Sequence, residues 1–258
     1  MIGLLVLTST LLHGSTIESR SPDELYKMGL AASQDAALAR LFFAQAAIEY
    51  EARWERGERT PGLARNLAQA HLLAGDLAAA IRAYRRGLCF TPADRDLRTG
   101  LKDARSRVDY PANRTLATMA QSRFRPSLLD RVQPDILRTV VAVLYALGLV
   151  AGARGWMTRR RSLWFLAFML LSLAGLMLML VTWEEQWLSE VAKLPGVVVR
   201  SETPLQRGNG IDYPARIPDA LPLGVELHLL AERGGWLQVQ LADGTIGWVD
   251  ARNVLRIE

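Results

Sequence analysis

The sequence predicts a multidomain membrane protein with an α-helical domain, a two-helix transmembrane hairpin and a small all-β barrel. Two apolar runs, at residues 136–153 and 162–183, predict the hairpin. Segments rich in Ala, Leu and Arg and without alternation predict helices over residues 22–109. Short alternating runs over residues 195–258 predict strands. A chain of 258 residues, 50% of them hydrophobic, is long enough for these separate modules.

The first residues, 1–15, are predicted to be a signal peptide. The apolar run from Ile2 to Leu12 is too short to span a bilayer, and the small residues Gly14 and Ser15 suit a cleavage site. The run lacks the basic residue that usually precedes such a segment. A hydrophobic terminus without a targeting role is therefore the alternative.

Residues 61–94 predict a helical hairpin. Pro61 suits the first turn of a helix, and Gly75 followed by Asp76 provides a helix stop and the N-cap of the next helix. This hairpin also contains a set of small, apolar and turn residues at characteristic positions. They are Asn66, Leu67, Ala68, His71, Gly75, Asp76, Ala80, Tyr84, Gly87 and Pro92.

This spacing resembles a tetratricopeptide repeat, and residues 22–109 as a whole resemble a tetratricopeptide-repeat domain with a degenerate first repeat and a final cap helix. The resemblance implies a concave groove that binds peptides or proteins. By the repeat pattern, Arg65, Gln69 and Leu72 should face that groove. The alternative for Arg65 and Gln69 is simple solvation.

A basic connector is predicted at residues 110–135, between the helical domain and the membrane. Its arginines alternate with Leu and Phe, so we expect it to lie along the membrane surface as an amphipathic segment. A solvated linker is the alternative. The arginines concerned are Arg114, Arg123, Arg125 and Arg131.

The hairpin at residues 136–183 is long enough to cross a membrane twice. The second run reaches about 33 Å and the first about 27 Å at 1.5 Å per residue, against a hydrocarbon core of about 30 Å. The alternative is a buried helix pair in a soluble core. Residues 140–153 and 162–183 hold no acidic, basic or histidine residue, which favours an anchor over an ion or proton path.

The loop expected at residues 154–161 carries four arginines, and the positive-inside rule places such a loop in the cytoplasm. A cleaved signal peptide would place the helical domain outside the cytoplasm. Both inferences put the helical and β domains together on the non-cytoplasmic face.

Strands are predicted at residues 197–200, 226–231, 237–241 and 246–249, with a tight turn at Asp243 and Gly244. Glycine and tryptophan positions, among them Gly224, Gly235 and Gly247, accompany these strands. The whole pattern resembles the bacterial SH3-like domain, which implies that Trp236, Trp248 and Tyr213 line a ligand face. Packing of the two tryptophans in the barrel wall is the alternative.

Composition and motifs favour neither an enzyme nor a nucleic-acid-binding protein. The net charge of +5 is concentrated around the apolar runs, where it suits anionic headgroups. The single cysteine, Cys89, and the three histidines form no cluster typical of a metal site or a catalytic triad, so we expect no cofactor and no metal. A hydrolase with dispersed carboxylates is a remote alternative.

The order of the modules is similar to that of the BatE family of bacterial aerotolerance-operon proteins. The resemblance implies a membrane-anchored, non-catalytic adaptor on the non-cytoplasmic face of a bacterial inner membrane. It also implies von Willebrand-type adhesion-domain proteins and a MoxR-type ATPase as partners. The alternative function is a cell-wall sensor whose SH3-like domain binds peptidoglycan peptides.

Overall fold

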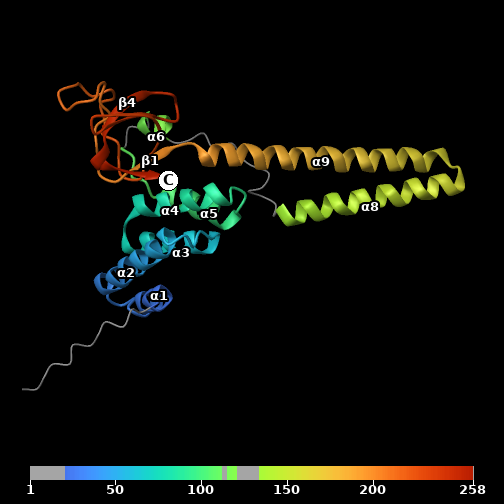
Figure 1. Cartoon of the computed structure of the whole chain (residues 1–258), viewed down its shortest axis with the longest axis horizontal. Helices are drawn as coiled ribbons and strands as arrows, with labels where there is room; N and C mark the ends of the chain where they lie inside the picture. Colours follow the sequence, from blue (N-terminus) through green and yellow to red (C-terminus); the bar gives the residue numbers. More distant parts are fainter. Residues whose placement is uncertain (1–20, 112–114, 121–133, 258) are drawn as a thin grey trace, which may run out of the picture.

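The computed structural model describes residues 21–111, 115–120 and 134–257 (Figure 1). The predicted signal peptide and the four connector arginines lie outside the described residues. The rest of the chain is mostly helical, with one five-stranded sheet. The helices are α1 (Pro22–Ala31), α2 (Ala36–Glu55), α3 (Pro61–Ala74), α4 (Leu77–Phe90), α5 (Arg95–Ser106), α6 (Thr115–Ala120), α8 (Pro134–Thr158) and α9 (Arg161–Lys193).

Polar side chains set the starts of helices α1 to α5. In each case the side chain before the helix accepts a hydrogen bond from a backbone N–H in the first turn, which satisfies a donor that the helix itself leaves free. Gly75 ends α3 with φ at 92°, a left-handed conformation that suits glycine. The predicted hairpin at 61–94 is confirmed as α3 and α4. The five caps are Ser21, Asp35, Thr60, Asp76 and Asp94.

Small residues let helices α1 to α5 pack closely as a stack. Each helix packs against the next in the chain, and α3 also contacts α5. Ala68 and Ala80 are fully buried in the seam between α3 and α4. A methyl group added at Gly87 would lie 2.6 Å from Cβ of Ala64, so the α4 backbone rests directly on α3. The stack forms by local pairing of neighbouring helices.

Helices α8 and α9 form the predicted hairpin, and both are long and apolar enough to cross a membrane. Only 11% and 17% of their apolar windows are buried within the protein, which argues against the alternative of a soluble core. Because large apolar side chains cover their outer surfaces, water is a poor solvent for them.

The hairpin differs from the prediction at its ends. The expected eight-residue loop is a two-residue turn at Arg159 and Arg160, with φ of Arg159 at 51°. Arginine is a good helix former and its long side chain can extend toward headgroups, so Arg154 and Arg161 are helical. For the same reason α9 runs beyond residue 183, through polar residues that favour helices, to Lys193.

The strands form one open antiparallel sheet in the order β4-β3-β2-β1-β5, and none of the described pairings joins β4 to β5. The closed barrel predicted from the sequence is therefore not what the structure has. Residues 200–225, which hold four prolines, make only isolated bridges because proline cannot donate to a ladder. The strands are β1 (Gly196–Val199), β2 (Glu226–Arg233), β3 (Trp236–Gln240), β4 (Ile246–Asp250) and β5 (Val254–Ile257).

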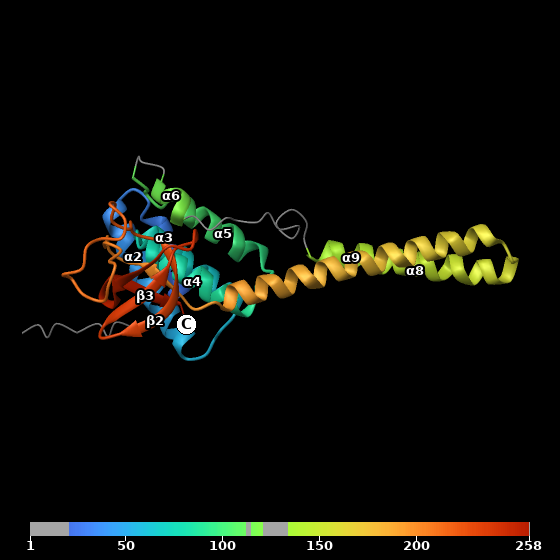
Figure 2. The ribbon, with the colours of Figure 1, turned by 90° about the horizontal axis from the view of Figure 1, so that it is seen from above.

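The helical stack and the sheet share one hydrophobic core, although the hairpin separates them in the sequence. Helix α4 contacts β1 and β5. Gly224, with φ at 91°, lies so close that an added methyl would be 3.0 Å from Val108 and 3.3 Å from Ile81. We call the stack, α6 and the sheet together the head (Figures 1 and 2). The hairpin projects from this head.

The described part of the connector belongs to the head. Leu116 and Ala120 of α6 are buried in the shared core, and the backbone N–H of Asp243 donates to the carbonyl of Met119. Helix α6 thus packs beside the turn between β3 and β4 (Figure 1). This short helix contributes to the core of the head.

Candidate functional site

The three predicted groove residues lie on α3 but differ in their surroundings. Arg65 donates to Asp96 of α5 at 2.5 Å, in a pair whose side chains are 42% and 66% exposed. Gln69, one turn further on, is exposed. Leu72 packs partly against the core. The side chain of Gln69 and the exposed part of the Arg65 side chain are therefore accessible to a partner. Leu72 instead packs against the core of the helical stack.

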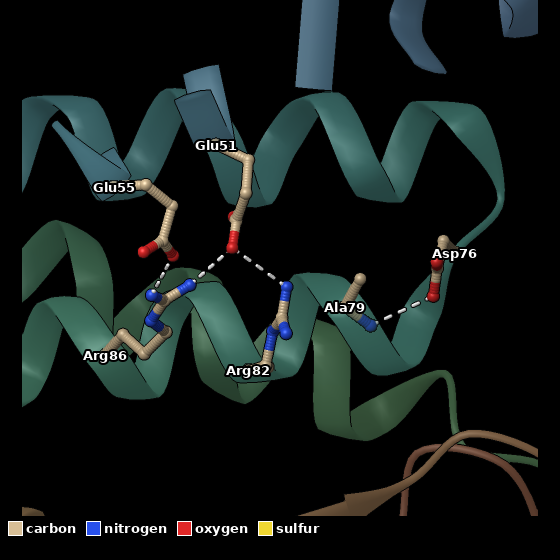
Figure 3. Close-up of polar contacts among 6 residues, drawn as sticks. All are labelled: Glu51, Glu55, Asp76, Ala79, Arg82 and Arg86. Carbon is tan, nitrogen blue, oxygen red and sulfur yellow. Dashed lines mark hydrogen bonds and ion pairs between the residues drawn. The ribbon is translucent and has the colours of Figure 1, made fainter. Parts of the chain in front are cut away.

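A network of charges that the sequence reasoning missed joins α2 to α4 (Figure 3). Arg86 is only 8% exposed, and it donates to Glu51 at 2.6 Å and to Glu55 at 2.8 Å. Arg82 donates to the same Glu51 oxygen at 3.1 Å. The sequence did contain a pattern that could have indicated it. Glu51 and Glu55, and likewise Arg82 and Arg86, are four residues apart, which places each like-charged pair on one face of its helix.

The network is neutralised and supports the fold. Burial alone would lower the pKa of Arg86, but its hydrogen bonds to Glu55 and Glu51 outweigh burial and raise it. The same hydrogen bond lowers the pKa of Glu55. The Arg86 guanidinium also lies 5.2 Å from the ring centre of Trp54. Because its charges are already paired and packed, the network has little capacity left for a ligand.

Glu226 of β2 connects the sheet to the helical stack. Its carboxylate accepts two hydrogen bonds from Arg105, at 2.5 Å to Nε and 2.9 Å to the guanidinium end, and Arg85 lies at 3.7 Å. Burial raises the pKa of Glu226, but the attraction of Arg105 and Arg85 outweighs burial and holds the pKa below its usual range. Burial lowers the pKa of Arg105, and Glu226 reverses that change. The ionised pair therefore persists at neutral pH.

Two of the three residues predicted for a ligand face, Trp236 and Trp248, lie on neighbouring strands of the sheet. Residues of β3 and β4 alternate between buried and half-exposed, and Gln238 lies opposite Trp248 while Trp236 lies opposite Asp250. Trp236 and Trp248 therefore occupy diagonal positions on one face of the sheet, both half-buried. The register thus brings together two of the three residues that the SH3-like resemblance assigns to a ligand face.

Tyr213 lies outside the strands, in the segment that follows Gln206. Its side chain is 51% exposed, and the ring covers Gly208, where an added methyl would lie 2.6 Å from it. Gln206 pairs with Trp248 through two backbone hydrogen bonds of 2.8 Å. The segment carrying Tyr213 is thus anchored at the edge strand β4, next to Trp248.

No protein-family model, curated protein or solved structure matches the chain in comparisons with known proteins. The accessible features of the described residues include the apolar hairpin, the α3 surface and the tryptophan face.

Replacing Glu226 by glutamine should lower the free energy of unfolding of the head by about 3 kcal/mol at pH 7, because it leaves buried arginines without their counter-charge. Since the pKa of Glu226 is depressed, its contribution is present above the ordinary glutamate value of about 4.3 and is lost as pH falls through the lower folded value. Stability of the native chain should fall with acid more steeply than that of the variant. Thermal melts in detergent between pH 7 and 2 measure both effects.

The matched control is Glu232→Gln, in the same strand. Glu232 pairs with Arg256 in the open, with side chains 48% and 41% exposed, so its loss should cost under about 1 kcal/mol. Equal effects of the two substitutions would contradict the assigned role of Glu226.

Proposed function

We propose that the chain is a membrane-anchored, non-catalytic adaptor that holds a protein-binding head on the non-cytoplasmic face of a bacterial inner membrane. The observation that carries the proposal is the combination of an apolar hairpin with little internal burial and a folded head made from both flanking segments. A two-span anchor returns the chain to the side on which it entered. That topology is required if the helical stack and the sheet share one core.

The orientation has a direct test. In a Cys89→Ala background, Arg159→Cys at the hairpin turn should resist an impermeant maleimide in spheroplasts and react after permeabilisation. Ile211→Cys, whose native side chain is 77% exposed in the head, should react without permeabilisation. Labelling of position 159 from outside would reverse the assigned orientation.

In this proposal the helical stack is a tetratricopeptide-repeat domain that binds the partner. The sequence spacing, the capped pair of α3 and α4 and the contact of α3 with α5 support this assignment. Arg65 and Gln69 present polar groups on α3 that suit recognition of a protein or peptide. By the BatE-like order of modules, the partners are von Willebrand-type adhesion-domain proteins and a MoxR-type ATPase system.

Loss of these two side chains tests the groove. Affinity capture of the full chain from detergent-solubilised membranes should recover a partner at least fivefold less well from Arg65→Ala/Gln69→Ala than from the native chain. A decrease of that size corresponds to about 1 kcal/mol of lost binding free energy. The matched control is Arg40→Ala/Gln45→Ala, which removes the same residue types from exposed positions on α2. Equal recovery from all three chains would exclude Arg65 and Gln69 from the binding site.

The tryptophan face favours a second candidate function, a cell-wall sensor that acts through the SH3-like domain. Half-exposed aromatic rings on one sheet face provide apolar contact area next to the polar Gln238. Such a face suits a peptidoglycan peptide. The two candidate functions are compatible, since α3 and the β3–β4 face lie on different elements.

Co-sedimentation with purified murein tests this candidate. The full chain in detergent should sediment with murein. Trp236→Ala should reduce the bound fraction severalfold, because the aromatic contact between the protein and the murein peptide is lost. Trp187→Ala, on α9 outside the head, is the matched control. If the native chain stays in the supernatant, the sheet face is not a murein-binding surface.

A further inference from the structure

The hairpin determines how far the head stands from the membrane. Arg138 at the start of α8 pairs with Glu185 of α9 at 2.9 Å, next to the end of the apolar segment. Ala192 follows seven residues later on the same helix, so it lies about 10 Å further along the axis. Its carbonyl accepts a hydrogen bond from the Cys89 thiol at 3.1 Å. The end of α4 is therefore held about 10 Å beyond the charged pair.

That height places one end of the helical stack near the headgroups, whose layer is about 5–8 Å deep on each side of the hydrocarbon. Phe90, the last residue of α4, is 50% exposed, and the Arg59 guanidinium lies 5.6 Å from the centre of its ring. The turn between α2 and α3 therefore lies beside the end of α4. Helix α9 leaves the head beside α4 in both views (Figures 1 and 2).

This end of the head carries exposed basic side chains that form no ion pair with any described residue. Two nearby carboxylates are already paired with other arginines: Glu55 with Arg86, and Asp96 with Arg65. Glu58 and Glu190 are exposed acids that offset part of the charge. We call the exposed set the basic rim, which consists of Arg56, Arg59, Phe90, Arg95 and Lys193.

We propose that the basic rim binds the phosphate groups of anionic phospholipids and so holds this end of the head against the membrane surface. Guanidinium groups pair with phosphate oxygens through two parallel hydrogen bonds, and Phe90 suits the interface where aromatic rings accumulate. Anionic lipid attracts each basic residue near its surface, which makes four cations sufficient for a measurable preference. The proposal rests on the proposed function, because it takes α8 and α9 as membrane-spanning.

The test places a fluorophore at the rim of the full chain in nanodiscs. Ala93→Cys, in a Cys89→Ala background, carries a bimane in the turn between α4 and α5, and a small equal fraction of lipid with a nitroxide headgroup serves as quencher. Discs with one quarter phosphatidylglycerol should quench the bimane about twofold more strongly than discs of phosphatidylcholine alone. High salt should remove the difference, since it screens the attraction.

Arg56→Ala/Arg95→Ala should lower quenching in the anionic discs to the neutral level. The matched control, Lys27→Ala/Arg40→Ala, removes the same charge from α1 and the first part of α2 and should leave quenching unchanged. Equal quenching in both disc types, or an equal loss in the control, overturns the rim proposal while the anchor stands. If the chain fails to enter discs at all, the two-span anchor and the rim proposal are both wrong.

Discussion

The buried pairing of Glu226 with Arg105 and Arg85 is the interaction that makes one head out of two distant parts of the chain. Glu226 follows the hairpin and both arginines precede it, so the contact closes a loop that contains both apolar helices. Taking these charges out of water is costly, and the geometry of the two hydrogen bonds offsets that cost. The pair also disfavours any docking arrangement that would bury these charges without their partners.

The apolar contacts around this pair make the arrangement specific in shape as well. Gly224 sits against Val108 and Ile81 with no room for a side chain, and α4 covers β1. Because α4 also contacts the base of α9, the same helix touches the stack, the sheet and the hairpin. Motion of the hairpin relative to the head would therefore have to break contacts in α4.

The sequence predicted the features that depend on local rules. Asp76 and Gly75 end one helix and start the next by backbone chemistry within a few residues, and the apolar runs of α8 and α9 follow from composition alone. Alternation also predicted strands at 237–241 and 246–249, which the structure has as β3 and β4. These features need no knowledge of distant partners.

The features that sequence reasoning missed depend on long-range contacts. Nothing near Glu226 indicates that its partner is Arg105, and nothing near Arg65 indicates that Asp96 engages it. Barrel closure failed for a related reason: alternation predicts strands, but closure requires an edge pairing that the proline-rich segment after β1 does not supply. The C-terminal strand β5 pairs instead with β1, an assignment that only the register reveals.

The interface between stack and sheet also limits where the head can bind a partner. Helix α4 and the Glu226 pair occupy the part of the sheet near β1, so the part that carries Trp236 and Trp248 is the part left half-exposed. On the helical side, the interface and the charged network use α4, while Gln69 of α3 stays in solvent. A partner that bound the buried faces of α4 would have to displace the core itself. The surfaces that these contacts leave accessible among the described residues include α3 and the tryptophan face, which are the two that the proposed function uses.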